Sequence, residues 1–192
     1  MKVVGISGSP RKSGNTECLV RECLSEFAAQ GWAVVEFFLS GKTVKPCSGC
    51  ETCVDSGVCA ITDDDAVSLF TEIINCDAVI IGSPVYYRNV TAQLKAIFDR
   101  SFAYKQNELL MGKPGGAIAA GRGEGGGQSN TLMIIYNYLL SSGALPVPGE
   151  INGLSARADK PGDIMLQERR LRQAHTLAQN VMKYAEKLRG LK

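Results

Sequence analysis

Four of the chain's seven cysteines lie in one short stretch, CSGCETCVDSGVC. Their spacing is C-x2-C-x2-C-x5-C, and three thiolates with two residues between each can wrap one corner of a cubane cluster while a fourth closes it. Structural zinc usually takes its thiolates from two separated C-x-x-C pairs, so the spacing favours a 4Fe-4S cluster, with a four-thiolate zinc site as the alternative. The odd total of cysteines argues against a disulfide framework. The predicted metal ligands are Cys47, Cys50, Cys53 and Cys59.

A second candidate site follows the first apolar run of the chain. The stretch SGSPRKSGNTECLV, residues 7–20, combines a turn-forming proline and glycines with hydroxyl, amide and basic side chains, and a helix follows. Because the amino terminus of a helix offers unpaired amides and a favourable dipole, we expect a phosphate to bind here. No G-x-x-x-x-G-K-[ST] pattern is present, which argues against a nucleotide triphosphatase. The simpler alternative is an ordinary helix cap at Ser13, with Glu17 in the first turn.

Two further motifs follow apolar runs in the same way. They are GSPVYYRNVTAQLKAIFDR, residues 82–100, and GRGEGGGQS, residues 121–129. The stretch 121–129 contains a formal G-x-G-x-x-G at Gly121, Gly123 and Gly126. It follows a late strand, and no acidic residue lies at the distance that a ribose contact needs, so we do not interpret it as a dinucleotide fingerprint.

The elements that must position these motifs alternate between strand and helix. Such alternation, bounded by glycine and proline, predicts a parallel sheet covered on both faces. The expected strands are 2–7, 32–39, 77–82, 115–120 and 144–147, and the expected helices are 13–30, 63–75, 90–102, 128–141 and 163–188. The acidic run that begins at Asp63 favours a capping box between Thr62 and Asp65 over a metal site.

Together the three motifs resemble those of flavodoxin-like FMN proteins, particularly the NAD(P)H-dependent FMN reductase and iron-sulfur flavoprotein group. The resemblance covers nearly the whole chain. It implies one FMN-binding domain over 1–192, a three-layer α/β sandwich with a five-stranded parallel sheet of order 2-1-3-4-5, and a cysteine-rich insertion at about 41–61. The first motif would wrap the FMN phosphate, the second pack on the flavin ring, and the third approach the flavin edge.

The resemblance also implies which residues contact the cofactor. The flavin performs the chemistry in this group, so no catalytic side chain is expected. By position, the implied FMN-binding residues are Ser7, Ser9, Arg11, Lys12, Ser13, Gly14, Asn15, Thr16, Pro84, Val85, Tyr86, Tyr87, Asn89, Gly121, Arg122 and Gly123, with Gln128 as a further polar candidate.

Iron-sulfur flavoproteins carry a compact four-cysteine motif followed by acidic residues, as in CSGCETCVDSGVCAITDDD here. Relatives in the wider reductase group keep similar loops without a cluster, so free thiols are the alternative. The other cysteines, Cys18, Cys23 and Cys76, fall in predicted helices or beside a strand and are expected to pack as small apolar residues.

Three functions fit these features. The leading hypothesis is an FMN-dependent oxidoreductase of the iron-sulfur flavoprotein type, which passes electrons between a ferredoxin-like or nicotinamide donor, NAD(P)H, and an acceptor. The enzyme alternative is a cluster-free NAD(P)H-dependent FMN or quinone reductase. The non-enzymatic alternative is a flavodoxin-type electron carrier.

Charge and hydropathy narrow the partners. The 21 basic and 19 acidic residues are spread along the chain, so no concentrated field favours nucleic acid or an anionic membrane. No apolar run approaches the length that spans a bilayer, and the amino-terminal run is too short for a signal peptide, so we expect a cytoplasmic protein. The resemblance implies a homodimer or homotetramer, for which the apolar stretch 101–114 offers an interface unless it folds back on the domain.

Overall fold

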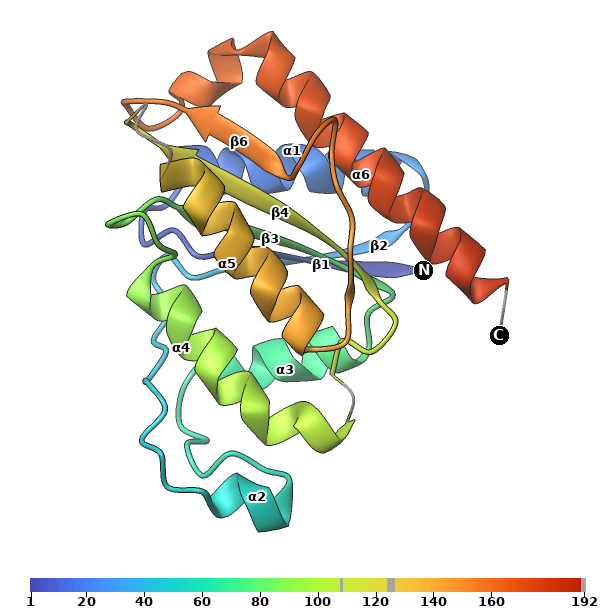
Figure 1. The fold of residues 1–192 in the computed structure, drawn as a ribbon. Coiled ribbons are helices and arrows are strands. Elements are labelled where there is room, and N and C mark those ends of the chain that lie inside the picture. The colour runs from blue at the N-terminus through green and yellow to red at the C-terminus, as the bar shows by residue number, and fades with distance from the viewer. Residues whose placement is uncertain (108, 124–126, 191–192) are drawn as a thin grey trace.

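The computed structural model describes residues 1–107, 109–123 and 127–190, and a parallel sheet forms its centre (Figure 1). The strands are β1 (Lys2–Ser7), β2 (Ala33–Phe38), β3 (Ala78–Pro84), β4 (Pro114–Gly121), β5 (Leu145–Pro146) and β6 (Leu154–Arg157). Neighbouring strands follow the order β2-β1-β3-β4-β5, β6 also pairs with β4, and each of these pairs is parallel. The strand order and the α/β fold class implied by the resemblance are therefore confirmed.

Helices cover both faces of the sheet. They are α1 (Asn15–Ala29), α2 (Thr52–Ser56), α3 (Ala66–Ile74), α4 (Ala92–Arg100), α5 (Gly127–Ser141) and α6 (Glu168–Arg189), with two short 3-10 helices, η1 (Ser101–Asn107) and η2 (Asp163–Leu166). Figure 1 shows α1 and α6 on one face and α3, α4 and α5 on the other. Successive strand residues point to opposite faces, so Val3 and Ile80 pack with α1 and α6, whereas Val4 and Ile81 pack with the other three helices.

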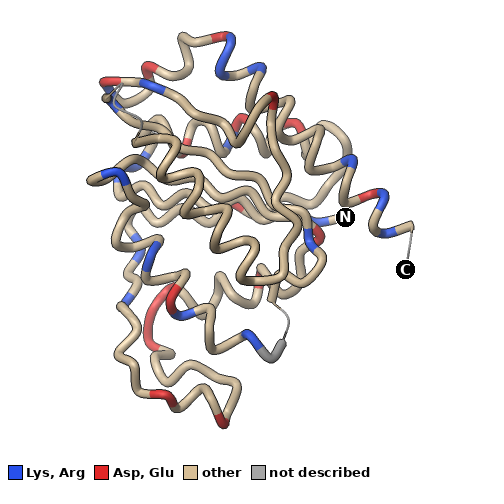
Figure 2. The backbone as a smooth tube through the Cα atoms, viewed as in Figure 1, with Lys and Arg blue, Asp and Glu red and all other residues tan. Residues whose placement is uncertain are grey.

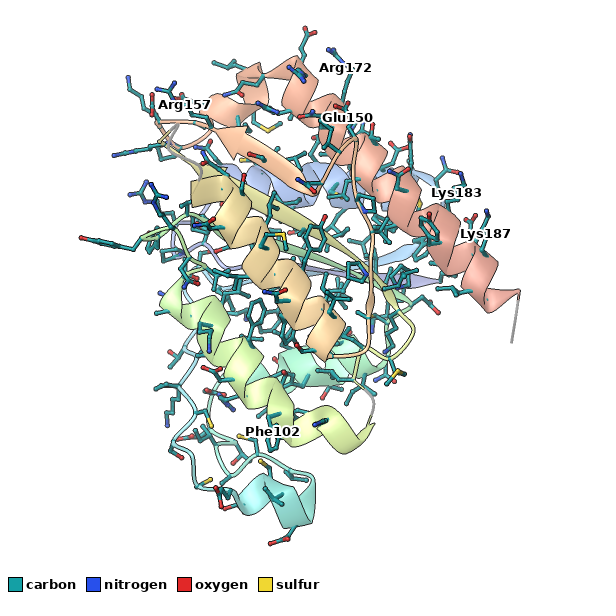
Figure 3. The ribbon with its side chains drawn as sticks, viewed as in Figure 1. Phe102, Glu150, Arg157, Arg172, Lys183 and Lys187 are labelled. Carbon is teal, nitrogen blue, oxygen red and sulfur yellow. The ribbon has the colours of Figure 1, made fainter. Side chains whose placement is uncertain are left out.

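The long helix α6 illustrates how the sequence pattern produces this packing. Its buried residues Ala174, Leu177, Ala178 and Val181 follow the i, i+3, i+4, i+7 spacing that places side chains on one helical face. That face packs against α1, while Lys183 and the other polar residues of the opposite face point outward (Figure 3). Within the described ranges, no helix combines the length and the apolar character that a bilayer crossing requires.

The fifth strand position differs from the prediction. A strand was expected over 144–147, but β5 has only two residues, and β6, which was not predicted, continues the same side of β4 from Ile118 to Gly121. Prolines 146 and 148 lack the amide that a longer strand would need. The chain therefore leaves the sheet after β5 and returns as β6.

The apolar stretch 101–114 folds back on the domain for much of its length. Leu110 is fully buried, and the ring of Tyr104 lies 4.4 Å from that of Phe70, centroid to centroid. Phe102 remains exposed. Only part of the apolar surface that the sequence suggested as an interface is therefore available to a partner.

Candidate functional site

The carboxyl ends of β1, β3, β4 and β6 meet at one edge of the sheet, where the structure has a cavity of about 390 Å³. Open α/β sheets bind their ligands at this edge, and the volume lies in the range of small-molecule sites. All three predicted motifs contribute to its wall. The predicted residues that line it are Ser9, Arg11, Gly14, Asn15, Thr16, Pro84, Val85, Tyr86, Gly121, Arg122 and Gly123.

The loop between β1 and α1 is held tightly against its neighbours. The Gly8 amide donates to the Gly82 carbonyl at 2.7 Å, and the Thr91 hydroxyl donates to the Gly8 carbonyl at 2.7 Å. A Cβ on Gly8 would lie 2.9 Å from two carbons of the buried Leu94 side chain. Only glycine allows this close approach, so the loop is fixed by β3 and by the start of α4.

Donor groups gather where α1 begins. Gly14, Asn15 and Thr16 line the cavity, and the first-turn amides of a helix have no acceptor within it. The Ser9 hydroxyl also faces the cavity and accepts a hydrogen bond from the Arg11 amide at 3.1 Å. The Arg11 side chain lies exposed at the rim. Amides, hydroxyls and a guanidinium at one end of the cavity suit an anionic group.

Three residues of the same loop do not line the cavity. Ser7 is buried and accepts from the Ser9 amide at 3.3 Å, and Lys12 is exposed. Ser13 has a left-handed backbone, with φ of 55°, and its amide donates to Glu17 Oε2 at 2.6 Å. The alternative interpretation, an ordinary cap at Ser13, is wrong, because Gly14 is the capping residue of α1.

The second motif forms a tight turn between β3 and α4. Tyr86 and Asn89 exchange backbone hydrogen bonds of 3.0 and 2.9 Å, and the two residues between them have positive φ values, 48° for Tyr87 and 61° for Arg88. Tyr87 is fully exposed, and the Asn89 side chain turns back to accept from the Val90 amide, so neither lines the cavity. Arg88, which the prediction omitted, does line it.

The third motif approaches the second through glycine. A Cβ on Gly121 would lie 3.0 Å from the Val85 side chain, and one on Gly127 would lie 2.8 Å from it. Gln128 lines the cavity and donates through Nε2 to the Gly123 carbonyl at 2.8 Å. The remaining glycine of the formal fingerprint, Gly126, lies outside the described residues.

A fourth wall was missed by the sequence analysis. It follows β6 and consists of Ala158, Asp159 and Pro161. Asn15 Nδ2 donates to the Lys160 carbonyl at 2.8 Å, and Arg122 Nε donates to the Asp159 carbonyl at 3.0 Å. The signal that could have revealed this wall is the end of a sixth strand, β6, which the prediction of five strands did not contain.

The four predicted metal ligands gather on the loop between β2 and α3, beneath the rest of the molecule in Figure 1. They line one small cavity of about 40 Å³ together with Arg100 and Phe102, and Figure 3 shows Phe102 beside this loop. The Gly49 amide donates to Cys47 Sγ at 3.4 Å, and hydrogen bonds from Thr52 and Ser48 lower the pKa of the exposed Cys50 thiol. In the part of the chain that the structure describes, no three metal-ligating side chains are assembled at metal-binding distances.

The other cysteines lie elsewhere. Cys23 and Cys76 are buried in the two cores, and burial raises the pKa of both thiols, that of Cys76 to about 11. Cys18 is half-buried, and burial raises its thiol pKa too. These features agree with the predicted packing role.

The acidic run after the cysteines does not form the predicted capping box. Helix α3 begins at Ala66, and Asp64 accepts from the amides of Ala66, at 3.2 Å, and Lys45, at 2.8 Å. Asp64 also forms a wholly buried ion pair with Arg100, the last residue of α4. Figure 2 shows the run as a continuous red stretch. The carboxylates of this run hold the two ends of the cysteine loop together, because they bond to residues that precede the cysteines as well as to helix α4.

Helix α4 connects the two candidate sites. Its capping residue, Thr91, contacts Gly8 beside the large cavity, and its last residue, Arg100, lies at the cysteine loop. Nine residues of α-helix span about 13 Å. Within one chain, the two sites are therefore separated by about the length of this helix.

The large cavity suits FMN in its donor chemistry and lies in the size range of small-molecule sites. One end offers the amides, hydroxyls and guanidinium that suit a phosphate, and the other is formed by Pro84, Val85, Tyr86 and glycine backbone, which suit a flat ring with polar edges. Together with the strand order, this defines a flavodoxin-like flavin-binding protein.

Sequence comparison identifies the family. The family described as NADPH-dependent FMN reductase matches residues 1–156, and this chain belongs to it. It is an FMN-dependent oxidoreductase. An iron-sulfur flavoprotein of Methanocaldococcus jannaschii is 38% identical over 185 residues, which cover 94% of this chain and 95% of the relative. One from Methanosarcina thermophila is 37% identical over 148 residues, 77% of each chain.

Solved structures support the fold. A flavone reductase superposes with a TM-score of 0.75 at 16% identity and covers 100% of this chain and 65% of its own. A flavodoxin, WrbA-like protein from Agrobacterium tumefaciens superposes with a TM-score of 0.63 at 18% identity, covering 95% and 98%. At these identities the likeness concerns the fold alone.

Proposed function

We propose that this protein is an iron-sulfur flavoprotein that carries FMN in the large cavity and a 4Fe-4S cluster on Cys47, Cys50, Cys53 and Cys59. The observation that carries the proposal is that all four cysteines line one cavity in a chain that also has an FMN-shaped site. The names of the relatives from two archaea support it. Residues 1–192 would form a single FMN-binding domain, with the cysteine loop as an insertion.

The residues of the cavity would divide the work of holding FMN. Ser9, Asn15 and Thr16, with the first amides of α1 and the charge of Arg11, would bind the phosphate. Tyr86 with its neighbours, and the backbone at Gly121, would contact the ring. The five predicted residues that do not line the cavity, Ser7, Lys12, Ser13, Tyr87 and Asn89, would support these contacts or face a partner.

When bound, FMN accepts a hydride from a nicotinamide and can release the two electrons singly. The protein's own part is to keep the ring accessible on one side and to place donors at its polar edge. Gln128 and Arg122 lie at the glycine-rich wall, where their N–H groups can serve as such donors. The tight contacts at Gly8 and Gly127 fix the loops, so the site loses little freedom when FMN binds.

The cysteine loop fits a cluster through its donor set. It supplies four thiols within thirteen residues. The backbone is left-handed at Gly49, Glu51 and Gly57, which lets the loop turn tightly, and the Gly49 amide faces sulfur. The loop must still contract to bring the thiols together, since the described residues hold no assembled metal site. The cluster would exchange single electrons with FMN and with a ferredoxin-like partner.

Anaerobic purification tests the cluster directly. We expect flavin bands together with broad cluster absorption, and about four iron and four sulfide per chain. Cys50→Ser should abolish iron and sulfide while leaving FMN in place, whereas the control Cys18→Ser, which removes a cysteine outside the loop, should keep all three. Wild-type protein that holds FMN but neither iron nor sulfide would refute the proposed transfer of electrons between a cluster and FMN.

A cluster-free NAD(P)H-dependent reductase is the second candidate, favoured by the absence of an assembled metal site among the described residues. Rapid turnover of NADPH by protein without iron would support it. An electron carrier without a substrate predicts the opposite, namely slow bleaching by either nicotinamide. The same assay with NADH and NADPH decides the preferred donor, and light scattering tests the expected homodimer or homotetramer.

A further inference from the structure

The guanidinium of Arg100 joins the two ends of the cysteine loop. Its side chain is wholly buried, and it donates to the Lys45 carbonyl at 3.3 Å and to the Ile61 carbonyl at 2.8 Å. Lys45 precedes Cys47 by two residues, and Ile61 follows Cys59 by two. One side chain, at the end of α4, therefore determines how far apart the first and last cysteines can lie.

Asp64 completes this arrangement. Its carboxylate is also wholly buried, pairs with Arg100 and accepts from the Lys45 amide. Burial alone would raise the pKa of Asp64, but the hydrogen bonds from Arg100, Lys45 and Ala66 outweigh it and lower the pKa. Removing one partner would strand a buried charge, so the pair is a strong geometric constraint on the loop.

A contrasting pair lies on the surface. Arg172 and Glu168 approach to 3.4 Å on α6, with side chains 69% and 88% exposed, and Figure 3 shows Arg172 on the outer side of this helix. Such pairs contribute little and fix no geometry. The two pairs share the same charges and differ in burial, which makes the surface pair a matched control.

Arg100 also faces the thiols. It lines the same small cavity as the four cysteines, and its Nε is buried without a hydrogen-bond acceptor among the described residues. The Arg100 side chain interacts with Cys59 as well as with Asp64. A permanent positive charge with a spare N–H group is thus placed beside the last cysteine.

We propose that Arg100 is a positioning residue for the cysteine loop. Its side chain clamps the two ends of the loop, and its charge and N–H groups face the sulfur of Cys59. The second part rests on the proposed function, because it concerns the cluster that those cysteines would hold. N–H donors beside sulfur stabilise the more negative, reduced cluster, so Arg100, whose charge is balanced by that of Asp64, raises its reduction potential through its N–H groups.

The potential is tested with the double variant Arg100→Gln/Asp64→Asn, which leaves no lone buried charge. Anaerobic protein is titrated with reductant while the reduced cluster is followed by electron paramagnetic resonance. We expect the midpoint to shift to a more negative value, and to stay unchanged in the surface control Arg172→Gln/Glu168→Gln. An unchanged midpoint in the buried variant would overturn the role toward sulfur.

The clamp is tested without the cluster, by amide hydrogen exchange on cluster-free protein. The amides of Thr43, Lys45 and Asp65 are bonded across the loop ends, and we expect them to exchange about tenfold faster or more in the buried variant. Unchanged exchange would overturn the clamp.

A second variant keeps the test decisive. Should the double variant fail to fold, Arg100→Lys, which keeps the charge and loses the planar fork, should speed exchange at the same amides and, because the N–H groups beside sulfur are lost, shift the midpoint to a more negative value as well. Wild-type protein without iron and sulfide would refute the cluster and the predicted potential shift together, and hydrogen exchange would still decide the clamp.

Discussion

The large cavity and the cysteine loop are built by different kinds of contact. Around the cavity, main-chain hydrogen bonds join neighbouring segments, as from Gly8 to Gly82 and from Val85 to Ala120. Inside the cysteine loop the main-chain bonds of this kind are local, such as Val54 to Glu51. The loop ends are joined by one main-chain bond, from Asp65 to Thr43, and by a buried ion pair. The large cavity is formed by the sheet in the absence of a ligand, whereas the cysteine loop would take its final shape only with the proposed cluster.

The largest expected effect comes from a substitution at the large cavity. Gly8→Ala should lower the free energy of unfolding by about 3 kcal/mol and abolish FMN binding, because the new Cβ meets the buried Leu94 side chain at 2.9 Å. Thermal unfolding and FMN fluorescence titration measure both effects.

Gly49→Ala is the matched change in the cysteine loop. A Cβ there would meet nothing within 4 Å, but φ is +67°, so only local strain of about 1 kcal/mol is expected. Iron content should fall while FMN binding stays. Equal effects of the two substitutions on FMN would contradict the difference between the regions.

The free energy of unfolding at alkaline pH tests the packed thiol of Cys76, which lies outside the cysteine loop. Burial raises the pKa of Cys76 to about 11 from 9.0, so above pH 9 the unfolded chain loses this proton while the folded chain keeps it. The free energy of unfolding should therefore fall between pH 9 and 11, by about 2 kcal/mol from this group. Denaturant titrations of wild type and Cys76→Ala at both pH values measure the difference, and parallel curves would show that Cys76 contributes nothing.

A smaller effect is expected at the start of α4. Thr91→Val removes the hydroxyl that donates to Gly8 and accepts from the Leu94 amide, which should cost about 1 to 2 kcal/mol and weaken FMN binding. Iron content should not change. Thr71→Val, at an exposed helical position, is the control and should leave stability and FMN affinity as they are.

The smallest expected effect is at the exposed turn. Tyr87 has a left-handed backbone that glycine adopts without strain, so Tyr87→Gly should raise the free energy of unfolding by up to about 1 kcal/mol. FMN affinity should change little, since Tyr87 does not line the cavity. A marked loss of FMN would instead show that Tyr87 closes over the ring.

The sequence predicted the first four strands, β1 to β4, and most of the cavity, because both depend on local patterns. β1 matches its predicted range, and glycine-rich turns after buried strands indicate where a ligand binds. The wall at Ala158 to Pro161 was missed because β6 is only four residues long, too short for the alternation in LSAR to indicate a strand by itself. A strand that short is defined by its neighbour β4 rather than by its own residues.

The pair between Asp64 and Arg100 could not be predicted for a different reason. The two residues are 36 positions apart, and each has a common local interpretation, Asp64 in a helix cap and Arg100 at a helix end. Only the packing of α4 beside the cysteine loop brings them together. Long-range partners of this kind are set by tertiary structure.

The interrupted edge of the sheet has a consequence for behaviour at high concentration. A long, flat edge strand offers a row of free amides and carbonyls to which another chain can add. Here two short strands cover β4, and Pro146, within β5, and Pro148, after it, have no amide to donate. We expect this edge to resist fibre growth and aggregation during folding.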